Sequence, residues 1–229
     1  MKSVYRTMPV QAVLLILLFL LFINSSASCE ETGRVDFDTE VVEVFSPATG
    51  RTWMDRNLGA SRVATSKDDE KAYGDLYQWG RPSDGHQKRN SPVTHLRSHS
   101  DQPNHGGFVS GLSDWRSPKN DNLWQGMDGM NNPCPAGYRL PTDTEWEAER
   151  SSWSSNNAAG AFDSPLKLPM AGGRRSFNNG SLFDVGSSGY YWSSTVHESD
   201  AEFLVILPAF AYMSRYNRTR GCSVRCIKD

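Results

Sequence analysis

The sequence has little excess charge of either sign. It carries 24 lysines and arginines against 26 aspartates and glutamates over 229 positions. Proteins that bind nucleic acid gather basic residues on one surface, and a nearly balanced, slightly acidic chain offers no such footprint. Nucleic acid is therefore not expected among the partners of this protein.

Recognisable catalytic and cofactor-binding motifs are also missing from the sequence. It contains no Ser/His/Asp signature, no glycine-rich phosphate loop and no paired-carboxylate arrangement. It contains no internal repeat either, and about 200 residues suffice for one domain with a substantial core. We expect a single domain that is not an enzyme and that uses no cofactor and no resident metal.

Long apolar runs are absent except near the N-terminus. There an apolar stretch at positions 12–23 follows the positive charges of Lys2 and Arg6. A membrane-spanning helix needs about 20 apolar residues, so a permanent transmembrane anchor is disfavoured. Small and polar residues follow at positions 24–28, as at a signal-peptide cleavage site. We predict a signal peptide over residues 1–28 and an extracytoplasmic protein, either secreted or held at the cell surface or outer membrane.

Cysteine is scarce, with four residues in the chain. Cys29 directly follows the predicted cleavage site, where bacterial lipoproteins carry their diacylglyceryl group, although Ser26 stands where leucine is preferred. We predict a lipid anchor on Cys29, which would be the protein's contact with a membrane. The alternative is a soluble protein that uses Cys29 in a disulfide, because exported cysteines tend to pair.

The other three cysteines are Cys134, Cys222 and Cys226. In one predicted strand the Cα atoms of Cys222 and Cys226 would lie about 13 Å apart, which is too far for a bridge. Cys134 is therefore expected to pair with one of them. If Cys29 is lipidated, one thiol is left over, and otherwise two disulfides are possible.

The chain is expected to start with a polar tether over residues 29–42, followed by a domain over 43–229. Residues 41–45 and 51–54 predict a β-hairpin. The segment 61–132 is irregular in pattern but rich in aromatic residues, which indicates an ordered excursion rather than a linker. Its aromatic residues are Tyr73, Tyr77, Trp79, Phe108, Trp115 and Trp124.

One principal helix is predicted after Thr142. Thr142 and Glu145 form a capping box, and Trp146, Arg150 and Trp153 recur at helical spacing towards an end near position 154. Short antiparallel strands are expected afterwards, so the fold class is α+β. Their ranges are 166–170, 182–185 after the turn at 179–180, 190–195, 202–207, 209–213 and 223–227.

Five phrases of the sequence together resemble a known family, the Fibrobacter succinogenes major paralogous domain. They are Gly50–Gly59 (GRTWMDRNLG), Tyr73–Gly80 (YGDLYQWG), Asn132–Thr142 (NPCPAGYRLPT), Gly189–Thr195 (GYYWSST) and Ser223–Asp229 (SVRCIKD). That family comprises extracytoplasmic bacterial domains, often lipoproteins, and is similar to the C-type-lectin-like fold, including its formylglycine-generating branch. The resemblance implies this fold, a bridge between Cys134 and Cys226, and a Cys222 that is unpaired or joined to Cys29.

Metal and sugar sites are not expected. The tripeptide at positions 102–104 resembles the sugar-binding tripeptide of calcium-dependent lectins, but it precedes the main helix instead of following it. Four histidines lie close together in the sequence, near Asp84 and Asp101, without the tight paired spacing of zinc sites, so they are interpreted as solvated loop residues. These are His86, His95, His99 and His105. The formylglycine-generating enzymes hold copper with two cysteines, which leaves Cys222 and Cys226 as a remote alternative.

The segment 192–221 is the predicted ligand-binding surface, because its aromatic, amide and charged side chains suit recognition. Its candidate residues are Trp192, His197, Glu202, Phe210, Tyr212, Tyr216, Asn217 and Arg218. Variable proteins of the lectin-like fold that are diversified by retroelements present ligand-binding residues in a similar place. In the alternative interpretation, Phe203, Val205 and Leu207 form a core strand whose edges the tyrosines cover.

The sequence thus predicts an exported, lipid-anchored module that binds a protein or glycan ligand. The alternative is a structural or adhesive envelope component without a dedicated pocket.

Overall fold

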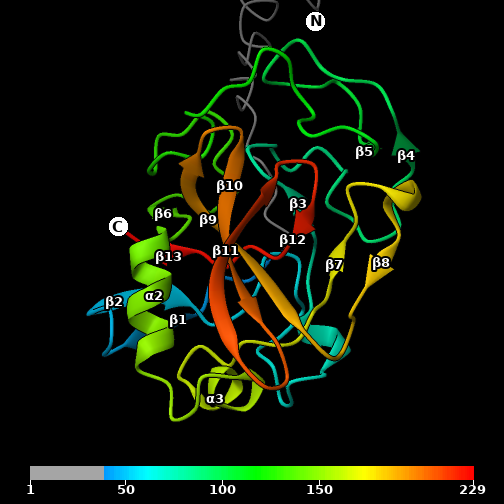
Figure 1. Ribbon diagram of the computed structural model, residues 1–229. Coiled ribbons are helices and arrows are strands. Elements are labelled where there is room, and N and C mark those ends of the chain that lie inside the picture. The colour runs from blue at the N-terminus through cyan, green and yellow to red at the C-terminus, as the bar shows by residue number, and fades with distance from the viewer. Residues whose placement is uncertain (1–38) are drawn as a thin grey trace, which may run out of the picture. The chain divides into compact units, whose positions relative to one another are not determined.

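The computed structural model describes residues 39–229, so the predicted signal peptide, Cys29 and most of the tether lie outside it. In this range the chain is strand-rich with few helices, as an α+β protein (Figure 1). Its elements are β1 (Glu43–Ser46), β2 (Arg51–Met54), η1 (Glu70–Ala72), β3 (Tyr77–Gln78), β4 (Val93–Thr94), β5 (Phe108–Val109), β6 (Tyr138–Arg139), α2 (Asp143–Ser151), α3 (Ala158–Asp163), β7 (Gly173–Arg174), η2 (Asn178–Gly180), β8 (Leu182–Phe183), β9 (Gly189–His197), β10 (Asp200–Ile206), β11 (Ala211–Asn217), β12 (Gly221–Cys222) and β13 (Ile227–Lys228).

The predicted N-terminal hairpin is confirmed. Strands β1 and β2 pair antiparallel, with Phe45 opposite Thr52. Strand β2 continues onto β13, and β13 onto β6, so that this sheet has the order β1-β2-β13-β6. The last strand of the chain therefore lies beside one of the first, and Trp53 and Ile227 pair across the contact, both fully buried.

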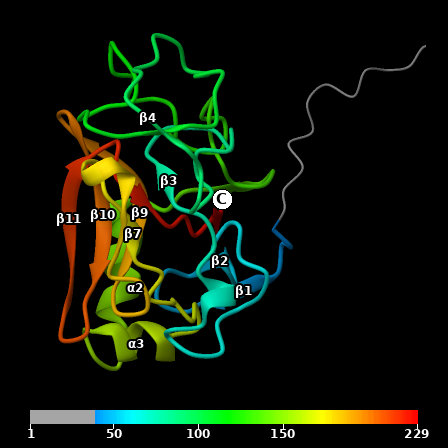
Figure 2. The ribbon, with the colours of Figure 1, turned by 90° about the vertical axis from the view of Figure 1, so that its right-hand side faces the viewer.

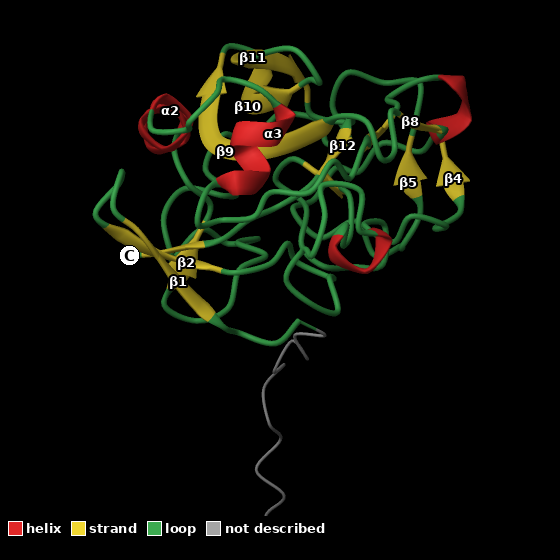
Figure 3. Ribbon diagram, turned by 90° about the horizontal axis from the view of Figure 1, so that it is seen from below, coloured by secondary structure: helices red, strands yellow, loops and turns green. Residues whose placement is uncertain are grey.

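The longest strands form a sheet with the order β11-β10-β9. Alternate residues of β10 point to opposite faces, and both faces are covered. Phe203 and Val205 pack into a core with Trp192, whereas Leu204 and Ile206 pack into a second core that includes residues of α2 and α3. Figures 2 and 3 show the two helices against this sheet. Strand β11 lies at the edge, with β10 on one side.

Helix α2 begins where the capping box predicts. The Thr142 hydroxyl accepts from the Glu145 amide at 3.2 Å, and the Glu145 carboxylate accepts from the Thr142 amide at 2.8 Å. The helix ends at Ser151, one turn before the predicted end. A second helix, α3, was not predicted, although Asn157 caps it by accepting from two backbone amides.

The aromatic excursion over 61–132 is ordered, as predicted, and its later part, with β4 and the loops drawn in green, lies beyond one end of the β9–β11 sheet (Figure 2). Trp79, Trp115 and Trp124 are at most 1 % exposed. The indole of Trp115 donates to the Trp79 carbonyl at 2.7 Å, and that of Trp124 donates to the Asn131 carbonyl at 2.8 Å. The indoles thus provide apolar area and satisfy carbonyls that no strand ladder reaches.

Buried arginines bind the remaining loop carbonyls. Arg225 is 1 % exposed and donates to the Met54 and Leu166 carbonyls at 3.2 and 2.7 Å. Arg174 donates to the Gly180 and Ser91 carbonyls, both at 2.8 Å. Burial lowers the pKa of both guanidinium groups to about 10, so they stay charged at neutral pH.

Two predicted strands are wrong, because side chains and loops satisfy backbone groups that a strand ladder would otherwise bind. Residues 166–170 are largely buried but form no strand. Their backbone groups bond to the Arg225 side chain and to loop residues instead of to a neighbouring strand. Of the predicted strand 223–227, only Ile227 lies in a strand, β13. Residues 223–226 connect β12 to β13, and their backbone groups bond to the segments 54–58 and 190–192. Strand β8 ends at Phe183, and β11 begins two residues later than predicted and extends to Asn217.

The disulfide implied by the family resemblance is present. Cys134 and Cys226 are bridged, with their Cα atoms 5.8 Å apart, and both residues are buried. The bridge ties the loop before α2 to the segment before β13. Cys222 is a free, fully buried thiol, and burial raises its pKa to about 12.

Candidate functional site

The structure does not gather the eight predicted ligand-binding residues on one surface. Trp192 and Arg218 are 0 % and 1 % exposed, so they do not contribute to a binding surface. The Trp192 indole donates to the Tyr77 carbonyl at 2.8 Å, and Arg218 pairs with Asp121 at 2.5 Å while its guanidinium lies over the Trp79 ring. Both side chains hold the aromatic excursion onto the central sheet.

Phe210 and Tyr212 mark the exposed turn between β10 and β11. Their side chains are 51 % and 41 % exposed. The two rings stack, with centroids 5.6 Å apart and an angle of 27° between their planes. Exposed aromatic rings that pack on each other form a preorganised apolar surface, which is the kind of feature that recognition sites use.

Tyr212 also belongs to a groove between α2 and β11. The groove has a volume of about 700 Å³, which is within the range of ligand-binding pockets. Its lining residues are Asp143, Thr144, Glu147, Ala148, Arg150 and Ser151 from α2, with Tyr212 and Met213 from β11. The prediction identified Tyr212, but it missed the helical wall, because no local pattern shows which strand α2 packs beside.

The two walls of this groove are tied together. Arg150 and Asn156 both donate to the Ala211 carbonyl, at 3.3 and 3.0 Å, and so hold the start of β11 to the helix side. Arg150 also pairs with Glu147 at 3.0 Å, which lowers the pKa of Glu147 and keeps it ionised. The Glu147 carboxylate therefore presents hydrogen-bond acceptors beside the Tyr212 wall.

His197 and Glu202 lie near the other end of β11. Arg215 approaches His197 at 2.7 Å, and Glu202 is the cross-strand partner of Arg215. Asn217 closes the strand and is engaged by Ser176 and Thr219. Asn217 lies five positions after Tyr212, about 17 Å of extended chain, so this polar end and the groove are different surfaces.

Tyr216 belongs to neither surface. It is half-buried against the core that contains Phe203, with the Arg220 guanidinium 4.6 Å from its ring centroid. The interpretation of the tyrosines as edge covers therefore fits Tyr216, whereas Tyr212 is free to contact a ligand.

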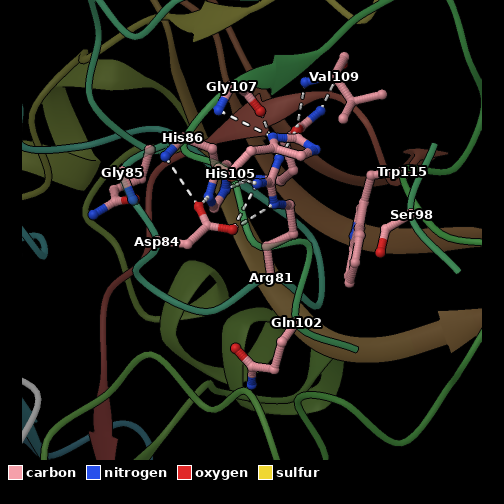
Figure 4. Close-up of polar contacts among 12 residues, drawn as sticks. Arg81, Asp84, Gly85, His86, Ser98, Gln102, His105, Gly107, Val109 and Trp115 are labelled. Carbon is pink, nitrogen blue, oxygen red and sulfur yellow. Dashed lines mark hydrogen bonds and ion pairs between the residues drawn. The ribbon is translucent and has the colours of Figure 1, made fainter. Parts of the chain in front are cut away.

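The interpretation of the histidines as solvated residues is wrong for His86, which is fully buried and whose ring faces Asp84 (Figure 4). The Gln78 amide donates to its Nε2 at 3.0 Å, so Nδ1 carries the proton that faces Asp84 at 2.6 Å. Burial and the nearby Arg81 lower the pKa of His86 to about 4. His86 is therefore a neutral structural residue, and the alternation of polar loop residues gave no sign of its burial.

His95 and His99 are exposed, as expected, and each contacts one loop carbonyl. Within residues 39–229 no group of three or more histidine, cysteine, aspartate or glutamate side chains is placed to hold a metal ion. Cys226 is engaged in the disulfide and cannot join Cys222 as a thiolate pair for copper. The remote copper-enzyme alternative therefore lacks its two-cysteine ligand set.

The chain matches no protein-family model, no curated protein and no solved structure in the comparisons made. Among the helices of residues 39–229, none is long and apolar enough to cross a membrane.

Proposed function

We propose that this protein is an exported, lipid-anchored binding module with a C-type-lectin-like fold, related to the Fibrobacter succinogenes major paralogous domain. It recognises a glycan or protein ligand through the groove between α2 and β11. The Cys134–Cys226 bridge supports the proposed fold, because it is the pairing that the family resemblance implies. The proposed anchor is the lipid on Cys29.

One observation carries the binding function. The C-terminal hairpin contributes an exposed aromatic stack, Phe210 and Tyr212, and Tyr212 also lines a groove of ligand size. Ionised Glu147 accepts hydrogen bonds on the helical wall, while the aromatic surface offers apolar contact. Such a combination suits a hydroxyl-bearing ring or a polar loop of another protein.

The test is a screen of the purified protein against glycan and protein arrays, followed by affinity measurements on variants. Tyr212→Ala should lower the affinity for a ligand found this way by about tenfold or more, since exposed aromatic anchors dominate such sites. Phe45→Ala is the matched control, because Phe45 is 58 % exposed on β1 and does not line the groove. Equal affinities for both variants would refute the assignment of the groove.

The anchor and the origin of the surface have separate tests. Mass spectrometry of the mature N-terminus should find a diacylglyceryl group on Cys29, and an unmodified terminus would exclude the lipoprotein. If the segment 192–221 is diversified, the neighbouring DNA should carry a reverse transcriptase and a template repeat of that coding region. Without this cassette the diversification proposal fails, whereas ordinary ligand binding does not.

A further inference from the structure

Two arginines of the C-terminal region lack a counter-charge. Arg175 follows β7, Arg220 precedes β12, and both are half-buried. Within residues 39–229 neither guanidinium forms an ion pair with a carboxylate. Other partly or fully buried arginines, such as Arg139 and Arg218, pair with carboxylates at 2.8 and 2.5 Å. Arg174 and Arg225 also lack a carboxylate, but they donate to backbone carbonyls. Among the described residues the guanidinium groups of Arg175 and Arg220 bond to neither a carboxylate nor a carbonyl, and this separates them from the arginines that hold the fold together.

Aromatic rings surround both guanidinium groups. The Arg220 guanidinium lies 4.6 Å from the ring centroids of Phe183 and Tyr216, 4.9 Å from that of Tyr190 and 5.5 Å from that of Phe203. The Arg175 guanidinium lies 4.8 Å from the centroid of the same Phe183 ring. We refer to these residues as the Arg175–Arg220 cluster: Arg175, Phe183, Tyr190, Phe203, Tyr216 and Arg220.

The cluster holds two like charges close together. Because both guanidinium carbons lie within 5 Å of one ring centroid, they are less than about 10 Å apart, around one Debye length at 0.1 M salt. The rings of Phe183, Tyr190 and Phe203 are at most 8 % exposed, which weakens solvent screening. A bound anion would neutralise this repulsion.

Arg220 also keeps unused donor capacity. Its Nε is buried and finds no acceptor. The Cys222 thiol, which contacts Arg220, is a weak acceptor and supplies no charge. The carboxylate of Asp184 accepts from the Tyr190 hydroxyl at 2.6 Å and does not pair with either guanidinium. The terminal nitrogens of both guanidinium groups donate to no oxygen among the described residues, so these donors remain available to an incoming acceptor oxygen.

We propose that the Arg175–Arg220 cluster binds the carboxylate of an acidic saccharide. Guanidinium groups match the planar geometry of a carboxylate and can hold it with two parallel hydrogen bonds. The sugar ring that carries the acid would lie against the accessible aromatic rings at the rim, Tyr216 and Phe177, the latter 45 % exposed beside Arg175. The site does not depend on the groove between α2 and β11.

The backbone around the cluster favours a saccharide over an acidic peptide. Extended peptides bind largely through main-chain hydrogen bonds. Here the Arg175 amide already donates to the Ser181 carbonyl at 2.9 Å, and the Arg220 amide donates to the Asn217 carbonyl at 3.2 Å. At both arginines recognition is therefore left to the side chains, which suits a ligand whose acid group is attached to a ring.

The test is calorimetric titration of the purified protein with a short oligogalacturonate. A neutral galactose oligomer of the same length, an oligoglutamate peptide and inorganic sulfate serve as comparison ligands. The oligogalacturonate should bind, the neutral oligomer should not, and added salt should weaken binding. Arg175→Gln and Arg220→Gln should each lower the affinity about tenfold or more, as expected for a lost charged hydrogen bond.

Arg51→Gln is the matched control, because Arg51 is exposed on β2 and its substitution removes one positive charge outside the cluster. If Arg220→Gln lowers the melting temperature through its lost ring contacts, Arg175→Gln decides, since it contacts fewer rings. Absence of oligogalacturonate binding, or affinities of both cluster variants equal to that of Arg51→Gln, would overturn the site. Equal or tighter binding of oligoglutamate or sulfate would overturn the saccharide assignment. Tyr212→Ala should leave oligogalacturonate binding unchanged. A failure of the Arg175–Arg220 cluster as a binding site can therefore be distinguished from a failure of the proposed groove.

Discussion

Removal of the Cys134–Cys226 bridge should cost much of the stability of the domain. The two cysteines are 92 residues apart in sequence, and closing a loop of this length lowers the entropy of the unfolded chain by the equivalent of about 4–5 kcal/mol at 25 °C. Domains of ordinary stability have a free energy of unfolding of about 5–15 kcal/mol, so the variant would retain little or none of it. We therefore expect Cys134→Ala combined with Cys226→Ala to unfold at much lower urea concentration than the wild type.

The double variant leaves no released thiol that air could oxidise to a non-native disulfide with Cys222 during unfolding. The measurement is urea unfolding followed by tryptophan fluorescence without reductant, with free energies extrapolated to water. Cys222→Ala is the control, because it removes a buried thiol without opening a loop. A loss below about 1 kcal/mol in the double variant, or an equal loss in Cys222→Ala, would refute the reasoning.

Three further predictions concern stability. His86 has a pKa lowered to about 4 against 6.5 unfolded, so the unfolded state binds the proton first and the stability present above pH 7 should fall by about 3 kcal/mol between pH 6.5 and 4; His86→Gln should flatten this slope in urea unfolding across that range, and an unchanged slope would contradict it. Thr142→Ala should cost about 0.5–2 kcal/mol in the same assay through loss of the capping box, with Thr144→Ala as the exposed control. Trp192→Ala should cost about 3–5 kcal/mol, whereas Tyr212→Ala should stay within about 0.5 kcal/mol, and similar losses would mean that Tyr212 is a core residue.

The elements predicted correctly are those specified by neighbouring residues. The hairpin 43–54 and the start of α2 depend on a turn and on a capping box. The failures are segments whose backbone partners are distant in sequence. Residues 166–170 have an apolar pattern typical of a strand and are largely buried, but no strand pairs with them. A periodic pattern therefore predicted that the segment is buried and could not predict what satisfies its backbone.

The binding surface was partly predictable for a related reason. Residue type identified side chains suited to recognition, and Tyr212 is one that is exposed beside a groove. Trp192 has the same chemistry but is buried, because the β9–β11 sheet is covered on both faces. Only the packing of α2 and of the aromatic excursion determines which faces are covered, and both packings join residues far apart in the chain.

Arginine side chains have two different roles in this fold. Some use their donors to stabilise the loops, whereas others keep donors that a ligand can bind. In segments without a strand ladder, a buried guanidinium offers five donors. Those of Arg225 are directed at carbonyl and amide oxygens of two separate segments, at Met54 and Asn57 and at Leu166. Four hydrogen bonds already occupy this guanidinium, and replacing it would leave the Met54 and Leu166 carbonyls without their donor. Arg220 is held by rings instead, which bind its face and leave its edge donors unused. Because the donors of a guanidinium lie in its plane, stacking fixes its position without consuming its hydrogen bonds, and this is why an arginine packed among rings without a carboxylate is a stronger candidate for anion recognition than an exposed one.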